Sequence, residues 1–78
     1  MIDDIKNYVF DNTFKIIIFK NKLNIINYKE IDHFDDNKII IRYSNKSLVI
    51  KGEELIITKL LDDEILINGK IKLVEFKW

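Results

Sequence analysis

The stretch that decides the fold is KIIIRYSNKSLVIKGEELIITKLLDDEILINGKIKLVEFKW, which runs from Lys38 to Trp78. Its apolar residues come in short runs, whereas an amphipathic helix usually needs at least about ten residues of 3.6-residue periodicity. The runs are rich in Ile, whose β-branched side chain packs well on a pleated sheet. They predict β-strands around Ile39–Ile41, Leu48–Ile50, Leu55–Ile57, Ile65–Ile67 and Ile71–Phe76.

Polar segments between these runs predict turns. Asn68-Gly69 lies between two apolar runs, and a type I′ hairpin turn needs positive φ at both central residues, which Asn and Gly tolerate best. Tyr43–Ser47, Lys51–Glu54 and Asp62–Glu64 predict further turns. Because all of these connections are short, neighbouring strands should be antiparallel.

The first half of the chain is less regular. Residues 1–12 carry Ile2, Ile5 and Val9 at the spacing of one helical face, so a short helix and a frayed terminus both remain open. The following segments predict strands, at Phe14–Phe19, Leu23–Tyr28 and Ile31–Phe34, with a turn at Asp35–Asn37.

Two changes of phase indicate a curved sheet. Ile71 and Leu73 share one face of a strand, but Val74 and Phe76 fall on the other. A β-bulge near Leu73-Val74 would turn both of these apolar sets inward, or a partner would cover one face. A similar change follows Ile25. The prediction is one all-β domain over residues 1–78, with the sheet in residues 13–78: an antiparallel meander of about six to eight short strands curled into a roll or sandwich.

Charge and composition limit the function classes. Lys plus Arg equals Asp plus Glu at 13 each, and there is no Cys. A balanced chain has no general attraction to phosphate backbones or anionic lipids. Ile16–Phe19 is the longest apolar run, far short of the roughly 20 residues of a membrane span, and the acidic start is unlike a signal peptide. The expectation is a cytoplasmic protein with no direct membrane span.

The polar clusters suggest no particular chemistry. His33 lies among Asp32, Asp35 and Asp36, which could bind a divalent metal or act as an acid and base pair. The spacing matches no ligand pattern, and Asp is common in turns without any function. The acidic run at Asp62–Glu64 is read the same way. We therefore predict no metal, no cofactor and no enzymatic activity; an enzyme would need His33 in a cleft beside a carboxylate.

A nucleic-acid-binding β-barrel is the alternative function. Such proteins stack bases on exposed aromatic rings beside basic residues. Tyr28-Lys29 and Arg42-Tyr43 supply these pairs, but lysines alternate with acids along the chain. This reading requires the four side chains on one exposed face.

Six segments form a recurring pattern: Ile26–Ile31, Phe34, Ile39–Arg42, Leu48–Ile57, Glu64–Ile71 and Val74–Phe76. Their core follows x-I-x-G-x-x-L-x-I, and a terminal hairpin follows I-x-I-x-G-x-I. Over about Phe14 to Phe76, these segments resemble the YabP/YqfC family of sporulation proteins, and its YqfC branch most closely.

The resemblance implies a role in endospore formation in Firmicutes, in the mother cell. It also implies a non-enzymatic assembly or scaffolding factor, held peripherally at the forespore membrane by a membrane-protein partner resembling YqfD. A second copy of the chain is another candidate partner. The apolar surplus on both strand faces favours docking through Phe19, Phe76 and Trp78.

Overall fold

The computed structural model describes residues 13–77. It contains six strands, in one antiparallel sheet of order β1-β2-β6-β5-β4-β3, and no helix within this range. The predicted all-β class is confirmed, while the N-terminal helix prediction and Trp78 lie outside the described residues. The strands are β1 (Lys15–Ile18), β2 (Lys22–Ile26), β3 (Glu30–Phe34), β4 (Lys38–Tyr43), β5 (Lys46–Leu60) and β6 (Glu64–Lys77).

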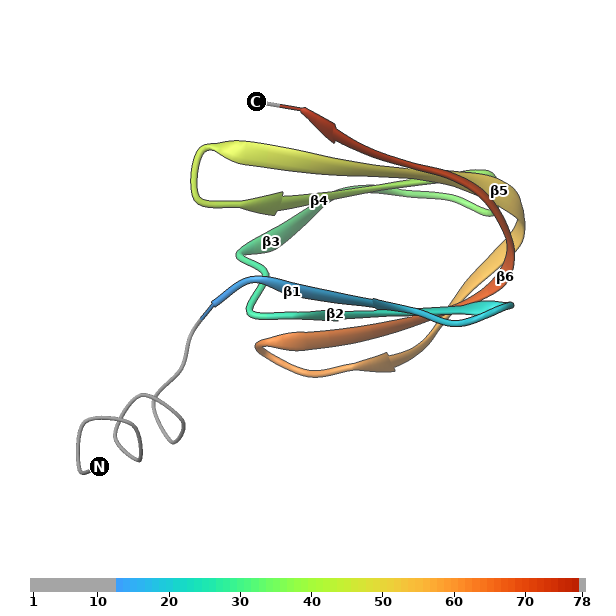
Figure 1. Ribbon diagram of the computed structural model, residues 1–78, viewed down its shortest axis with the longest axis horizontal. Coiled ribbons are helices and arrows are strands. Elements are labelled where there is room, and N and C mark those ends of the chain that lie inside the picture. Colours follow the sequence, from blue (N-terminus) through green and yellow to red (C-terminus); the bar gives the residue numbers. More distant parts are fainter. Residues whose placement is uncertain (1–12, 78) are drawn as a thin grey trace.

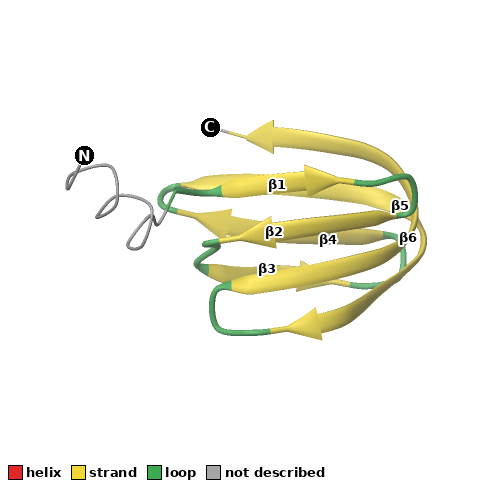
Figure 2. Ribbon diagram, turned by 60° about the horizontal axis from the view of Figure 1, so that its bottom comes forward, coloured by secondary structure: helices red, strands yellow, loops and turns green. Residues whose placement is uncertain are grey.

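The order departs from a simple meander at one place. Strands β3 to β6 follow one another as neighbours, but the β1–β2 hairpin pairs with the first half of β6. The sheet curls, as predicted, because the two long strands β5 and β6 bend sharply midway (Figure 1). One layer holds β3, β4, the first half of β5 and the second half of β6; the other holds the remaining halves with β1 and β2 (Figure 2). We call these the β3/β4 layer and the β1/β2 layer.

Two predicted turns are wrong. Asn68-Gly69 lies inside β6, and Lys51–Glu54 lies inside β5. Both segments form the bends instead, where the register between the strands shifts. Gly69 has φ 137° and Glu54 has φ 54°, so the backbone turns without ending the strand. A Cβ on Gly69 would lie 2.7 Å from the Glu54 carbonyl oxygen, so Gly is needed there for close approach of two strands.

The other predicted turns are found where expected. Ser44-Asn45 connects β4 and β5, with Ser44 in the left-handed region at φ 55°. Bends at Asp36-Asn37 and Asp62-Asp63 connect β3 to β4 and β5 to β6. Asp and Asn favour such positions because their side chains bond to nearby backbone amides.

A bulge occurs in β6, slightly before its predicted position. Lys51 pairs with Leu73 while Gly52 pairs with Ile71, so Lys72 is the extra residue. Ile71 and Val74 therefore both pack toward the core, although three residues apart. Leu73 points away from the core and is 44% exposed, so the bulge turns Ile71 inward but not Leu73, and the alternative of a partner over this face stays a prediction.

The core lies between the two layers. Leu23 and Ile25 of β2 face it from one layer, and Ile39 and Ile41 of β4 from the other. Each such side chain contributes roughly 1.5–3 kcal/mol on full burial. The complete set is Leu23, Ile25, Ile39, Ile41, Leu48, Ile50, Leu55, Ile65 and Ile67, all with at most 2% exposure.

Aromatic side chains connect the layers at both open sides. Phe14, just before β1, stacks on Tyr43 of β4 with ring centroids 3.7 Å apart. On the other side, the Tyr28 hydroxyl donates a hydrogen bond of 2.7 Å to the Leu61 carbonyl oxygen. The β1/β2 layer is therefore fastened to the β3/β4 layer at each side of the core.

Candidate functional site

The edge strand β1 and the residue after it carry three consecutive exposed apolar side chains. Among residues 13–77, only β2 pairs with it. Ile17, Ile18 and Phe19 follow one another and are 42%, 63% and 52% exposed. Sheet edges usually carry charge or Pro that discourages pairing with another chain, but this edge ends in three large apolar residues. We call Ile17, Ile18 and Phe19 the β1 edge.

The local geometry explains these exposures. Ile16 pairs with Ile25 and packs against the core, so Ile17 faces outward, opposite Asn24. Ile18 pairs with buried Leu23 but lies at the end of the strand, where its side chain remains 63% exposed. The Phe19 N–H donates a 2.8 Å hydrogen bond to the Lys22 carbonyl oxygen, which fixes the exposed ring at a tight turn.

Two unsatisfied amide oxygens lie on the outer face of the β1/β2 layer, that of Asn24 opposite Ile17 and that of Asn68 between Lys22 and Ile56. The side-chain oxygens of Asn24 and Asn68 are buried and have no donor among the described residues. Asn24 donates its own N–H to Glu64 at 3.0 Å, which leaves only the oxygen without a partner. A buried acceptor left unpaired costs about 1–3 kcal/mol. Both oxygens are inaccessible from outside, so they are a local cost of the fold and not a contact surface for a docked chain.

The other two predicted docking residues are placed differently. Phe76 is 45% exposed and contacts Tyr43 edge-on, with ring centroids 6.5 Å apart. Tyr43 in turn stacks on Phe14, so this aromatic group lies at the beginning of β1, whereas Phe19 follows its end. Phe19 and Phe76 therefore form two separate patches. Trp78 lies outside the described residues.

The sequence did not indicate that Ile18 is exposed. It also did not indicate the exposure of Leu60, the last residue of β5, or of Leu61, which follows it; these side chains are 58% and 48% exposed. The one sequence feature that indicated exposed apolar residues was the predicted strand Phe14–Phe19, which has apolar residues on both faces. That signal shows a surplus of apolar side chains, but the exposed members depend on which strand is at the edge.

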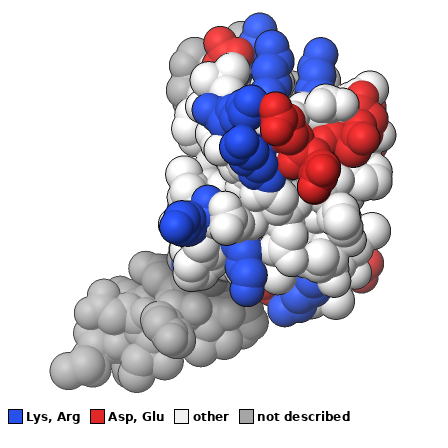
Figure 3. Space-filling view, turned by 90° about the vertical axis from the view of Figure 1, so that its right-hand side faces the viewer, with Lys and Arg blue, Asp and Glu red and all other residues white. Residues whose placement is uncertain are grey.

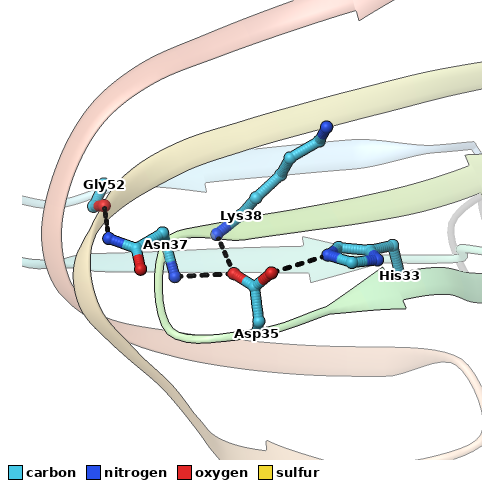
Figure 4. A network of polar contacts seen from close by, with 5 residues as sticks. All are labelled: His33, Asp35, Asn37, Lys38 and Gly52. Atoms are coloured by element: carbon cyan, nitrogen blue, oxygen red, sulfur yellow. Dashed lines mark hydrogen bonds and ion pairs between the residues drawn. The ribbon is translucent and has the colours of Figure 1, made fainter.

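His33 and Asp35 form a surface pair that organises the β3–β4 turn (Figure 4). The His33 Nε2 atom lies 2.8 Å from a carboxylate oxygen of Asp35. The other Asp35 oxygen accepts the backbone N–H groups of Asn37 at 2.8 Å and Lys38 at 2.7 Å. The hydrogen bond from His33, followed by that from Asn37, lowers the pKa of Asp35 below its ordinary value of 3.8. This arrangement is that of a turn-capping carboxylate.

The other members of the predicted acidic cluster do not join this pair. Asp32 lies 3.6 Å from the Arg42 guanidinium, which also forms an ion pair with Glu30. Within residues 13–77, no group of three His, Asp or Glu side chains is arranged to hold a metal ion. The side chains of His33 and Asp35 are 45% and 49% exposed, so the pair does not sit in an enclosed cleft.

The four residues of the nucleic-acid alternative lie on neighbouring segments, where the Lys29 N–H donates to the Arg42 carbonyl oxygen at 2.8 Å, but their side chains do not share a face. Arg42 points outward to Glu30 and Asp32, while Tyr43 points to Phe14. The Tyr28 hydroxyl is bonded to Leu61, and burial, with Asp62 and Asp63 nearby, raises its pKa. The single exposed face that this alternative requires is therefore not formed.

Charges at the bend of β5 and β6 are mixed in sign (Figure 3). Lys72 donates to Glu53 at 2.7 Å, and Lys70 lies 3.9 Å from the same carboxylate. The hydrogen bond from Lys72 and its charge lower the pKa of Glu53. Exposed pairs of this kind contribute little to stability and present no surface of a single sign.

A model of the YabP family matches residues 12–78, a range that includes all six strands. The chain belongs to the YabP family. Membership indicates a sporulation-related role and agrees with the resemblance seen in the sequence. No curated protein matches this YabP-family chain. In the described part of the chain, no helical segment has the length and apolar character that a bilayer crossing requires.

Proposed function

We propose that this YabP-family protein is a non-enzymatic assembly factor of sporulation that holds a partner protein at the β1 edge. The observation that carries the proposal is the run Ile17-Ile18-Phe19, exposed on a strand that pairs on one side only among the described residues. The proposed site of action is the cytoplasm of the mother cell, with any attachment to the forespore membrane made through a membrane-protein partner.

Strand addition supplies both affinity and selectivity in such a complex. The partner's backbone would pair with the side of β1 that faces away from β2, and its apolar side chains would cover Ile18 and Phe19. Together, two such side chains offer the kind of central apolar anchor on which interfaces depend.

The experiment is a count of heat-resistant spores in a spore-forming host of this gene. Strains carry a deletion, the wild-type gene, Ile18→Lys or Leu60→Lys. Lys on an edge strand opposes strand addition, and both replaced side chains are similarly exposed, at 63% and 58%. We expect deletion and Ile18→Lys to lower the count strongly, and Leu60→Lys to retain it. Immunoblots check that both variants accumulate to the wild-type level.

Two outcomes contradict this proposal. A deletion strain with a full spore count would contradict the sporulation role. A normal count for Ile18→Lys, together with a low count for the deletion, would contradict the β1 edge as the docking site.

Sedimentation of the purified wild type and Ile18→Lys then identifies one class of partner. A dimer that becomes a monomer on substitution means that the partner is a second copy of the chain.

A further inference from the structure

The outward face of the β3/β4 layer has a shallow hollow, far from the β1 edge in the sheet. Its volume is about 270 Å³. Strands β4, β5 and β6 form its floor and walls. The side chains that matter here are Lys38, Lys51, Lys77, Ile40, Val49 and Glu75.

The strand register arranges these side chains in three rows. Lys38 and Lys51 are directly opposite each other in the first row. Ile40, Val49 and Glu75 form the second row, and Arg42, Ser47 and Lys77 form the third. Successive rows are two residues apart, which corresponds to about 6.7 Å along a strand. An apolar strip therefore lies between two basic rows.

The three lysines are unneutralised in the described chain. None of Lys38, Lys51 and Lys77 forms an ion pair within residues 13–77, and three lysines against the one Glu75 leave a net charge of two positive. Several other cations on this sheet are paired: Arg42 contacts Glu30 and Asp32, Lys72 contacts Glu53, and Lys59 contacts Glu64. Like charges directly opposite in a sheet are destabilising, so the Lys38–Lys51 pair carries a cost that an anion would remove.

The shape of the hollow narrows the class of ligand. Val49 is only 5% exposed and Ile40 is partly buried, so the apolar strip is recessed between longer lysine side chains. A flat bilayer would not reach such a floor, but a single apolar side chain would. Bound single-stranded nucleic acid usually stacks on aromatic rings, and none of the side chains lining the hollow is aromatic.

We propose that this face binds an extended acidic peptide of the pattern acid-x-apolar-x-acid. Alternate residues of an extended peptide point to the same side with the same spacing of about 6.7 Å, which matches the three rows. The first acid lies on Lys38 and Lys51, the apolar side chain covers Ile40 and Val49, and the second acid lies on Lys77. Glu75 repels a carboxylate at the middle position and so selects an apolar residue there. The site is separate from the β1 edge and does not rest on the proposed function.

Fluorescence anisotropy with synthetic peptides tests the proposal. The probe is a labelled peptide that contains Glu-Thr-Leu-Thr-Glu; the comparison peptides replace both Glu by Gln, or Leu by Ser. We expect the probe to bind, each comparison peptide to bind at least about tenfold more weakly, and the affinity to fall as salt rises. Lys38→Gln/Lys51→Gln should weaken the probe at least about tenfold, whereas Lys22→Gln/Lys29→Gln, with the same change of charge, should bind like the wild type.

Several outcomes would overturn this proposal. Equal binding of the Leu and Ser peptides would reduce the site to a general anion patch. Binding of phosphatidylglycerol vesicles or of a labelled oligothymidine, without binding of the probe, would assign the face to a membrane or to nucleic acid. Absence of binding by all of these would leave the three lysines without a ligand of this class.

A charge reversal separates binding from folding. Lys51→Glu should pair with Lys38 across the strands, raise the melting temperature by about 2 °C or more and weaken the probe at least about tenfold. A variant that is more stable but does not bind is the signature of a residue retained for a ligand. If Lys51→Glu binds the probe as the wild type does, the assignment of the first row is wrong.

Discussion

One carboxylate, Asp35, organises the β3–β4 turn and the bend that follows it. It accepts two backbone N–H groups and holds His33 (Figure 4). The turn then reaches β5: the Gly52 N–H donates to the Asn37 carbonyl at 3.0 Å, and the Asn37 side chain donates back to Gly52 at 3.3 Å. The bend in β5 is therefore supported by the β3–β4 turn, although the Asp-rich sequence of this turn predicted only a local change of direction.

The lowered pKa of Asp35 makes this turn sensitive to acid. A carboxyl group whose pKa is lower in the folded than in the unfolded chain stabilises fully above its ordinary value, here 3.8. That stabilisation is lost as the pH falls below 3.8 through the lower folded pKa. Asp35→Asn keeps an acceptor oxygen but removes the titration, so its melting temperature should fall less than that of the wild type between about pH 5 and pH 2.

Thermal melts followed by circular dichroism across this range provide the measurement. Asp36→Asn is the control, because the Asp36 carboxylate makes no hydrogen bond to a described residue while its neighbour makes three. It should follow the wild-type curve. If the melting temperatures of Asp35→Asn and the wild type fall in parallel with pH, the hydrogen bonds of the turn do not favour the ionised form of Asp35.

At the scale of strands, short-range patterns predicted where strands form better than where they end. The turns at Ser44-Asn45 and Asp62-Asp63 were predictable because local residues alone determine them. Asn68-Gly69 carries an equally strong local signal, yet it lies inside β6. There, Gly serves the approach of Glu54 from another strand, and that contact is not encoded in the neighbouring residues.

Gly69→Ala tests this reading of the bend. The residue has φ 137°, and an added Cβ would lie 2.7 Å from the Glu54 carbonyl oxygen, in backbone that cannot move aside alone. We expect a loss of about 2 kcal/mol or more in the free energy of unfolding. Lys70→Ala, one residue further at a side chain that is 70% exposed, should change it by less than about 0.5 kcal/mol. Urea denaturation measures both; a loss for Gly69→Ala no larger than the control would mean that the bend tolerates a side chain.

The candidate site was predictable in part for a related reason. Phe14–Phe19 has apolar residues on both faces, so a surplus was evident, and Phe19 is indeed half exposed. Which residues remain uncovered depends on the strand order, which places β1 at the edge and β2 beside β6. The three lysines that form no ion pair within residues 13–77 were hidden for the same reason: Lys38, Lys51 and Lys77 are distant in sequence, and only the register of three strands brings them to one face.

At the scale of the molecule, the two layers share one core but are joined along the chain mainly through the bends of β5 and β6. Leu55 lies at this junction, where it is 2% exposed and packs with core residues of both layers. Its backbone N–H donates to the Asp36 carbonyl at 2.9 Å, so the bend is also tied to the β3–β4 turn. Stability of either layer should therefore depend on the junction as a whole.

Leu55→Ala is expected to lower the free energy of unfolding by about 2–5 kcal/mol, because it removes a buried side chain and leaves a cavity between the layers. Ile56→Ala is the matched control: the side chain is adjacent but 57% exposed, so its loss should cost less than about 0.5 kcal/mol. Nuclear magnetic resonance in increasing urea follows the amide signals of β2 and β4. In each variant the two sets of signals should disappear at the same urea concentration, and this concentration should be lower for Leu55→Ala than for Ile56→Ala. If β2 signals were lost while β4 remained folded, the layers would be separate folding units, and a partner at the β1 edge would stabilise only the layer to which it binds.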